Sequence, residues 1–322
     1  MNAAMPFGYR IVGPCSLERK VVQYDRAFAA YAACDDLAQI DSEGFLSPFQ
    51  YDNEFLTRRI DAAGTLDVRG FDGRCWSRFI WFDIDREGDI DSATQDARRL
   101  AMMLVERYRI DESELLLFFS GSKGFHIGLP TSLFDVEPSI EFGSVVRKLA
   151  EGLTASVRVV IDPSVYGKVQ PLRAPNSRHG KTGRHKRILT FDELMHRKPS
   201  SIVTASAEPL EFDLPTEPGI DQRAVDDWHA AVAAMKRKAE AVKVIAADRS
   251  ELNRSTLEFI QDGAEQGDRH RLLYSAAANL GEFGCPSRLA HALLTEAALD
   301  SGLTPTDVRR AIDNALSKGG AV

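Results

Sequence analysis

The sequence has 322 residues, of which 44% are hydrophobic and 27% are charged. This length allows two ordinary domains, each with a hydrophobic core of its own. No run of about eighteen apolar residues occurs, which excludes a membrane-spanning helix, and the first residues lack the pattern of a secretory signal. We therefore expect a soluble, cytoplasmic protein.

The formal net charge is −7 and the pI is about 5.6. A molecule with this charge repels a phosphate backbone at long range, so any nucleic-acid site must be a local basic patch. The four cysteines, at positions 15, 34, 75 and 285, form no C-x-x-C pair. This argues against a disulfide framework and against a zinc knuckle, and we expect no zinc.

The first part of the chain predicts a mixture of helices and strands. Apolar and small residues at helical spacing predict a helix from Tyr24 to Ile40, followed by a loop or short strands over residues 45–55. The run RFIWFDID, Arg78 to Asp85, predicts a buried strand that ends in acids. A Ser start signal and apolar residues at steps of three and four predict a helix over Ser92 to Tyr108.

The next segment, ELLLFFSGSKGFHIGLP, residues 114–130, predicts a hairpin whose turn is rich in Gly and Ser. A helix is expected from about Ile140 to Leu153. The run VRVVID, Val157 to Asp162, predicts a second apolar strand that ends in an acid. An irregular basic stretch follows and ends in another expected strand near residue 189. This mixture predicts an α+β core.

A segment rich in Pro and Glu, residues 200–219, is typical of a linker or a strap. We therefore divide the chain into a catalytic domain at 1–205, a linker at 206–220 and a C-terminal domain at 221–322. The last domain begins with a long amphipathic helix and contains at least three more, one of which starts near Pro305. It is predicted to be all-helical.

Asp83 and Asp85 stand two residues apart, so on a strand both carboxylates leave the same face. Two carboxylates this close repel unless a cation lies between them, and such hard oxygen ligands suit Mg²⁺ or Mn²⁺. Alternatively, they are ordinary solvated acids at the end of a strand, because D-x-D alone is common.

The SGSKGFH turn could hold phosphates, since its glycines let backbone amides approach and Lys123 and His126 supply donors. Alternatively, this segment is an ordinary hairpin turn without a binding role. The most basic window follows Asp162 and holds seven cations: Lys168, Arg173, Arg178, Lys181, Arg184, Lys186 and Arg187. It is either a solvated loop or the wall that binds the phosphates.

The order D-x-D, then SGSKGFH, then an apolar strand ending in Asp with a basic R-x-P-x-S segment, resembles the archaeo-eukaryotic primase superfamily. The resemblance covers about Asp67 to Leu194. It implies a primase-type catalytic core with mixed or antiparallel sheets and flanking helices. It also implies a small version of the kind found in phages, plasmids and mobile elements, because no zinc-binding insertion is recognisable.

The resemblance also implies roles for residues. Asp83, Asp85 and Asp162 correspond to the catalytic acids, which bind two ions of Mg²⁺ or Mn²⁺. The residues implied to bind the incoming NTP or dNTP are Ser122, Lys123, His126, Arg173, Ser177, His179 and Lys181. The helical end resembles domains that hold the template or the first nucleotide, and its candidates are Arg269, His270, Arg271, Arg309 and Arg310.

These features predict a DNA primase or primase-polymerase that synthesises primers on single-stranded DNA by two-metal phosphoryl transfer. No G-x-x-x-x-G-K-[ST] motif occurs in the sequence, so a replicative helicase on another chain is the expected partner. Two alternatives stay open. The chain could be a repair or gap-filling polymerase of the same superfamily, or a catalytically silent replication initiator that binds nucleic acid.

Overall fold

The computed structural model describes residues 5–59, 66–68, 71–168, 170–247, 252–265 and 267–319. The chain divides into two compact units, Met1–Val232 and Ala233–Val322. Within the described ranges, no helix is both long enough and apolar enough to cross a membrane.

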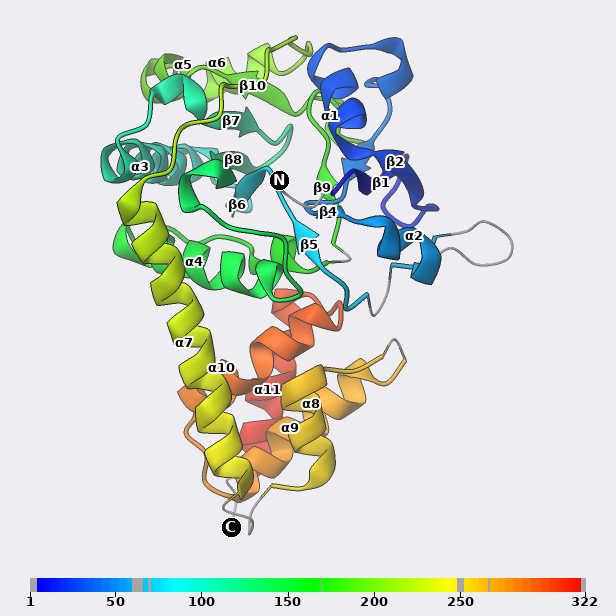
Figure 1. Ribbon diagram of the computed structural model, residues 1–322, viewed down its shortest axis with the longest axis vertical. Helices are drawn as coiled ribbons and strands as arrows, with labels where there is room; N and C mark the ends of the chain where they lie inside the picture. The colour runs from blue at the N-terminus through cyan, green and yellow to red at the C-terminus, as the bar shows by residue number, and fades with distance from the viewer. Residues whose placement is uncertain are drawn as a thin grey trace. The chain divides into compact units, whose positions relative to one another are not determined.

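The first unit contains two antiparallel sheets (Figure 1). One has the strand order β5-β4-β1-β3-β9, with β2 paired to β1. Its strands are β1 (Phe7–Val12), β2 (Lys20–Gln23), β3 (Gly44–Leu46), β4 (Gln50–Tyr51), β5 (Cys75–Trp76) and β9 (Leu172–Arg173). The other has the order β10-β7-β8-β6. Its strands are β6 (Phe79–Asp85), β7 (Leu116–Phe119), β8 (Gly124–Pro130) and β10 (Arg187–Leu189).

Helices surround these sheets. The first unit contains α1 (Tyr24–Ala32), α2 (Asn53–Arg59), α3 (Ile90–Tyr108), α4 (Phe142–Ser156), α5 (Phe191–His196) and α6 (Pro199–Ala205). Four 3₁₀ turns join them: η1 (Asp36–Ala38), η2 (Glu112–Glu114), η3 (Thr131–Phe134) and η4 (Pro163–Tyr166). Helix α3 packs on β6 and β8, and α4 packs on β6. The predicted α+β core is confirmed.

Strand β6 shows why this sequence delivers acids at its end. Phe82 and Ile84 are completely buried, whereas the residues between and after them, Asp83 and Asp85, are partly exposed on the other face. The predicted hairpin is confirmed as β7 and β8, and β8 pairs with β6 so that Asp83 lies opposite His126. The D-x-D pair and the SGSKGFH turn are therefore neighbours in one sheet.

The helix expected over Tyr24–Ile40 is wrong in its second half. Helix α1 stops at Ala32, and Cys34 has a φ of 50°. Asp35 then accepts a hydrogen bond from the amide of Leu37 and starts η1. Short polar side chains compete in this way with helical hydrogen bonding, which explains why the helix does not continue.

The strand expected over Val157–Asp162 is also wrong. The segment leaves α4 through a turn in which Arg158 has a φ of 55°, and the amide of Val159 bonds back to the carbonyl of Thr154. Val159 is buried but Val160 is 61% exposed. The apolar run therefore serves to cap the helix and fill one core position, because the turn prevents it from joining a sheet.

Residues 206–221 run along the first unit without regular structure. The amide of Phe212 donates to the carbonyl of Ala32, and the Phe212 ring packs edge-on against Phe118. Helix α7 (Gln222–Ala247) then begins, and its residue Asp227 accepts hydrogen bonds from Arg107 and Tyr108. The linker boundary itself stays a prediction.

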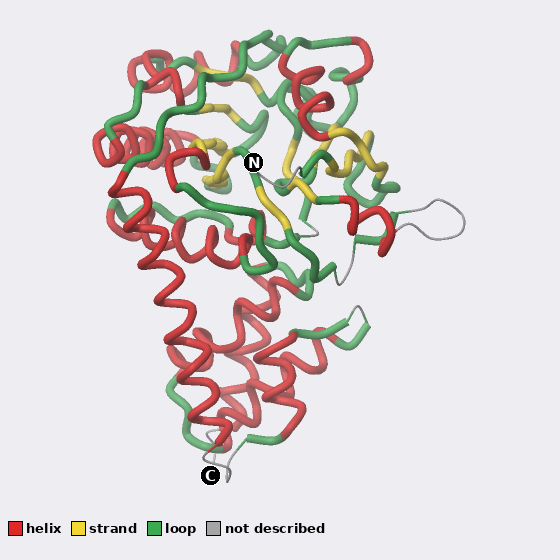
Figure 2. The backbone as a smooth tube through the Cα atoms, in the orientation of Figure 1, coloured by secondary structure: helices red, strands yellow, loops and turns green. Residues whose placement is uncertain are grey.

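The second unit contains the part of α7 from Ala233 onward, followed by α8 (Arg254–Asp262), α9 (Arg269–Glu282), α10 (Ser287–Asp300) and α11 (Pro305–Gly319). From α7 onward the described regular structure is all-helical (Figure 2), as predicted. Leu273, Leu294 and Ile312 come from three of these helices and are completely buried together. Pro305 is the first residue of α11, where its missing N–H costs no helical hydrogen bond.

Candidate active site

Three acids lie on two segments whose backbones are joined at the end of β6. Asp83 and Asp85 share one face of the strand. The amide of Asp162 donates to the carbonyl of Asp83 at 2.8 Å, so the turn after α4 brings the third acid alongside the strand. Just beyond it, the hydroxyl of Tyr166 donates to the carbonyl of Trp81 at 2.7 Å and fixes η4 to the same strand. Residues far apart in the sequence are thus joined through the backbone.

The charges of Asp83 and Asp162 affect the pKa of Asp85. Burial, together with the negative charges of Asp83 and Asp162, raises the pKa of Asp85 to about 6. The Lys123 ammonium opposes the shift, because its Nζ lies 3.2 Å from Oδ2 of Asp85. A carboxyl group whose pKa is raised by burial and by neighbouring carboxylates is typical of a site that binds a positive charge.

These acids fit Mg²⁺ or Mn²⁺ by chemistry but are not gathered around a common point. Among the residues that the structure describes, no three His, Cys, Asp or Glu side chains are close enough together to hold a metal ion. Asp85 pairs with Lys123, and Asp162 accepts a hydrogen bond from the amide of Ser164 at 2.9 Å. However, Oδ1 of Asp83 is buried and faces Nε2 of His126 at 3.3 Å without a hydrogen bond of good geometry, which suits a cation ligand. Binding would require Asp85 and Asp162 to turn from their present partners.

His126 lies opposite Asp83 on the neighbouring strand β8. Its Nε2 is 3.3 Å from Oδ1 of Asp83, and its side chain is 7% exposed. Burial lowers the pKa of His126, and the nearby Lys186 ammonium lowers this pKa further. The imidazole is therefore neutral at pH 7. In the turn before it, Ser122 is half-buried and Lys123 is exposed.

The basic stretch forms a loop against the SGSKGFH turn. The hydroxyl of Thr182 donates to the carbonyl of Gly121 at 2.6 Å. Gly121 has a φ of 86°, and a Cβ on it would lie 3.1 Å from the carbonyl oxygen of Arg184. The loop therefore requires glycine there. Because of these contacts, the phosphate-binding candidates of both motifs lie on adjoining segments.

The candidates on this loop are placed differently. Arg173 lies on β9, paired with Phe45 of β3, and its guanidinium stacks on the Phe45 ring at 4.8 Å. Ser177 is completely buried, and its hydroxyl donates to the carbonyls of Gly44 and Ala174. It supports the loop from inside, which sequence reasoning did not foresee.

His179 is half-buried and Lys181 is exposed at the tip of the loop. Nδ1 of His179 accepts hydrogen bonds from the amides of Lys181 and Thr182 at 3.2 and 3.3 Å. Burial lowers the pKa of His179, and the Arg173 charge lowers it further. This imidazole therefore shapes the turn, while the Lys181 ammonium is left facing solvent.

Two residues of this region were missed from the sequence. In the sequence Lys186 is only one of seven cations, yet its side chain is completely buried and its Nζ donates to the carbonyl of Arg173 at 2.8 Å. Glu43 belongs to no sequence motif, because it is a single acid 130 positions from Arg173. In the structure it pairs with that arginine at 3.4 Å. Only the folded chain brings these groups together.

The helical candidates lie in the second unit. Arg269 donates to the carbonyls of Ser301 and Gly302, and Arg271 pairs with Asp268. Both are engaged within the unit, whereas His270 is exposed.

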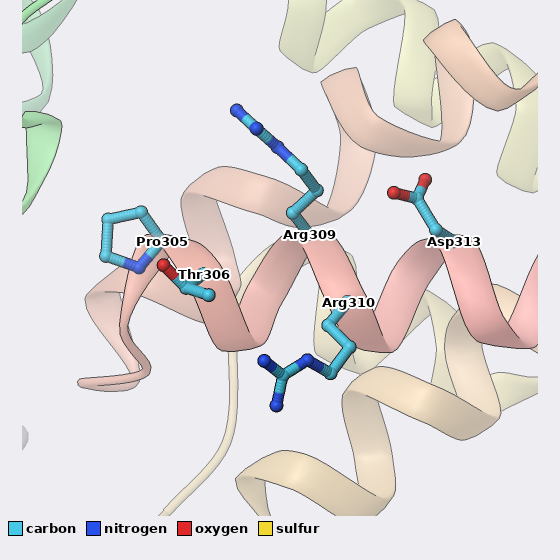
Figure 3. A pocket seen from close by; sticks show the side chains of 5 residues that line it. All are labelled: Pro305, Thr306, Arg309, Arg310 and Asp313. Carbon is cyan, nitrogen blue, oxygen red and sulfur yellow. The ribbon is translucent and has the colours of Figure 1, made fainter.

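Arg309 and Arg310 line a surface pocket of about 280 Å³ together with Pro305, Thr306 and Asp313. Figure 3 shows that their guanidinium groups extend toward different sides of α11. This pocket is open to solvent, so the structure leaves both arginines accessible.

Comparison with known proteins agrees with this geometry. Residues 82–191, which hold all three acids, the turn and the basic loop, match the family model of the DNA primase small subunit. This segment belongs to the primase superfamily. The resemblance predicted from the motifs is thereby confirmed. Glu43 and the helical unit lie outside this primase segment.

A solved structure described as primase RepB' is similar to this chain at 10% sequence identity. The match covers 98% of this chain and 90% of that one, with a TM-score of 0.36, a similarity too low to support an argument about function. No curated protein matches the sequence. The assignment of residues 82–191 to the primases is therefore based on the family match and on the contacts described above.

Proposed function

We propose that this chain is a template-dependent nucleotidyltransferase that synthesises primers on single-stranded DNA. The observation that carries the proposal is the bond between the amide of Asp162 and the carbonyl of Asp83, which joins the third acid to the D-x-D strand. The family match to the primase small subunit supports a primase-type activity. Substrate, metal requirement and mechanism are our inference from the residues.

In this proposal Asp83, Asp85 and Asp162 hold two ions of Mg²⁺ or Mn²⁺. Bound there, such ions would neutralise the developing charge on the phosphates and activate the attacking 3′-hydroxyl. Lys123 is already within 3.2 Å of Asp85, so it can move to a phosphate when that acid turns to a cation. His126 stays neutral and buried and keeps the Asp83 carboxylate in place.

Arg173 and the basic loop supply the positive wall for the triphosphate. The loop carries exposed Arg178 and Lys181 and is tied to the SGSKGFH turn through Thr182. In a chain with a net charge of −7, this local concentration of cations is what a polyanionic substrate needs. The template would be unwound by a helicase on another chain, because the sequence has no Walker-type phosphate loop.

The test is synthesis on an unprimed single-stranded template with free nucleotides and Mg²⁺ or Mn²⁺. Wild type should form dinucleotides and longer products. Asp83→Asn should lose activity by on the order of a thousandfold, because catalysis here is electrostatic. Asp91→Asn, an exposed acid six positions after Asp85, serves as the matched control and should keep wild-type activity.

Other outcomes would favour other functions. Extension of existing primers without dinucleotide formation would indicate a repair or gap-filling polymerase with the same site. Template binding without any synthesis by wild type would indicate a silent nucleic-acid-binding initiator. Undiminished synthesis by Asp83→Asn would remove the assigned acids from the mechanism.

A further inference from the structure

Glu43 places a carboxylate in contact with the candidate phosphate-binding groups. Its Oε1 accepts a hydrogen bond from the amide of Gly180 at 3.0 Å. The same oxygen lies 3.4 Å from both Nη1 and Nη2 of Arg173. One carboxylate oxygen thus faces three N–H donors, two from a guanidinium and one from the backbone of the basic loop.

The fold holds this carboxylate closely against the loop. The carbonyl of Glu43 accepts from the amide of Gly13 at 2.7 Å, and the following strand β3 pairs with β9, which carries Arg173. At position 180 a Cβ would lie only 2.6 Å from Cδ of Glu43, so glycine is what permits the contact. Side-chain exposure is 23% for Glu43 and 12% for Arg173, so the pair is largely shielded from water.

The donors around Glu43 form a typical anion site. A guanidinium fork with a neighbouring backbone amide is the set that binds a phosphate oxygen. Exposed Arg178 and Lys181 flank Gly180 on either side in the loop sequence. A carboxylate inside such a set occupies the position of a phosphate oxygen.

We propose that Glu43 is an internal occupant of the triphosphate cradle, displaced from Arg173 and Gly180 by the phosphates of the incoming nucleotide. The inference rests on the proposed function, because it takes Arg173 as a triphosphate ligand. Glu43 is a positioning residue: it keeps the arginine and the loop ordered without nucleotide. Its displacement must weaken nucleotide binding, since an ion pair is broken and a negative charge stays near the phosphates.

The inference is tested by measuring the affinity of the full chain for inorganic tripolyphosphate by titration calorimetry. Glu43→Gln keeps an oxygen that can accept from Gly180 but removes the charge. It should bind tripolyphosphate about tenfold more tightly than wild type, by the Coulomb energy of one partly shielded charge. Asp52→Asn is the matched control, because it removes a carboxylate that pairs with Arg74 at 3.0 Å, and it should bind like wild type.

Equal or weaker binding by Glu43→Gln would overturn the inference. If that variant melts well below wild type, Glu43→Asp provides a second measurement. Aspartate keeps the negative charge, but its shorter side chain places the carboxylate farther from Arg173. Tighter binding is again expected, and unchanged or weaker binding would overturn the inference.

Arg173→Gln separates this inference from the proposed function. If Arg173→Gln weakens binding and Glu43→Gln does not strengthen it, only the role of Glu43 is lost. If Arg173→Gln binds like wild type, or if neither wild type nor Glu43→Gln binds tripolyphosphate, the assignment of Arg173 to the triphosphate is lost as well, and the inference with it.

Discussion

Lys186 is a cation buried beside the candidate site. Its Nζ lies 4.9 Å from the ring centre of Trp81 and 4.8 Å from that of Phe118, and it donates to the carbonyl of Arg173. Burial, which the Asp83 charge opposes only in part, lowers the pKa of Lys186 to about 7. A side chain held in this way links the β6–β8 sheet to the backbone that presents Arg173.

This buried lysine should make stability depend on pH. The folded pKa of about 7 lies below the usual value of 10.5. Between these two values the unfolded chain holds a proton that the folded chain lacks, so the free energy of unfolding rises with pH. Lys186→Met lacks this contribution. The stability of wild type relative to the variant should therefore increase by about 2 kcal/mol from pH 7 to pH 9.

Urea unfolding followed by tryptophan fluorescence measures this difference, because Trp76, Trp81 and Trp228 all lie in the first unit. Lys198→Met, at an exposed position, should show no such pH-dependent difference. Parallel pH curves for wild type and Lys186→Met would show that the lysine is not buried as described.

Residues of the site divide into those visible in the sequence and those that are not. Asp83, Asp85 and His126 could be predicted because strand alternation and a short hairpin fix their spacing. Glu43 could not be, because its partners are brought to it by the pairing of β3 with β9 and by a glycine contact. Such pairings are set by tertiary packing and leave no local pattern.

The pairing of β6 with β8 determines where Asp83 and Asp85 lie. Gly124 is opposite Asp85, and a Cβ on it would lie 1.8 Å from the carbonyl oxygen of Ile84. Gly124→Ala should therefore break the pairing and destabilise the first unit by several kcal/mol, roughly as other severe backbone clashes do. The loss should appear as a lower urea midpoint in tryptophan fluorescence.

Gly152→Ala is the matched control for this substitution. Gly152 lies inside α4, and its added Cβ would meet nothing within 4 Å. Alanine there should raise stability by about 0.5–1 kcal/mol, because glycine is the poorer helix former. A Gly124→Ala variant as stable as wild type would contradict the close approach of the two strands.

Elements with a strong period were predicted best. Helices α3, α4 and α7 and strand β6 follow their apolar patterns to within a few residues. The strand predicted over Val157 to Asp162 is wrong because the turn at the end of α4 is set by the left-handed Arg158, for which the sequence has no signal. Asp162 nevertheless lies beside Asp83, because its amide donates a hydrogen bond to the Asp83 carbonyl.

The net negative charge of the chain limits how DNA can be held. We expect Arg309 and Arg310 of the second unit to contact template phosphates, since both line an open pocket. On single strands each phosphate contact contributes about 0.7 to the slope of log K against log salt. Replacing both arginines by Gln should therefore reduce the slope by about 1.4 and weaken template binding.

Fluorescence anisotropy with labelled single-stranded DNA at several salt concentrations measures this slope. The double variant Arg254→Gln and Arg288→Gln, two exposed arginines on α8 and α10, is the matched control. If both double variants change the slope equally, the pocket has no special role in template binding.

In the proposed mechanism Asp83, Asp85 and Asp162 share divalent cations. Electron paramagnetic resonance of Mn²⁺ titrated into the full chain measures this most directly. Removal of an outer partner already costs about 10–100-fold in metal affinity, so loss of a ligand should cost at least that. We predict this loss for both Asp83→Asn and Asp162→Asn, and wild-type binding for Asp91→Asn. Wild-type Mn²⁺ affinity in Asp162→Asn would contradict the shared site.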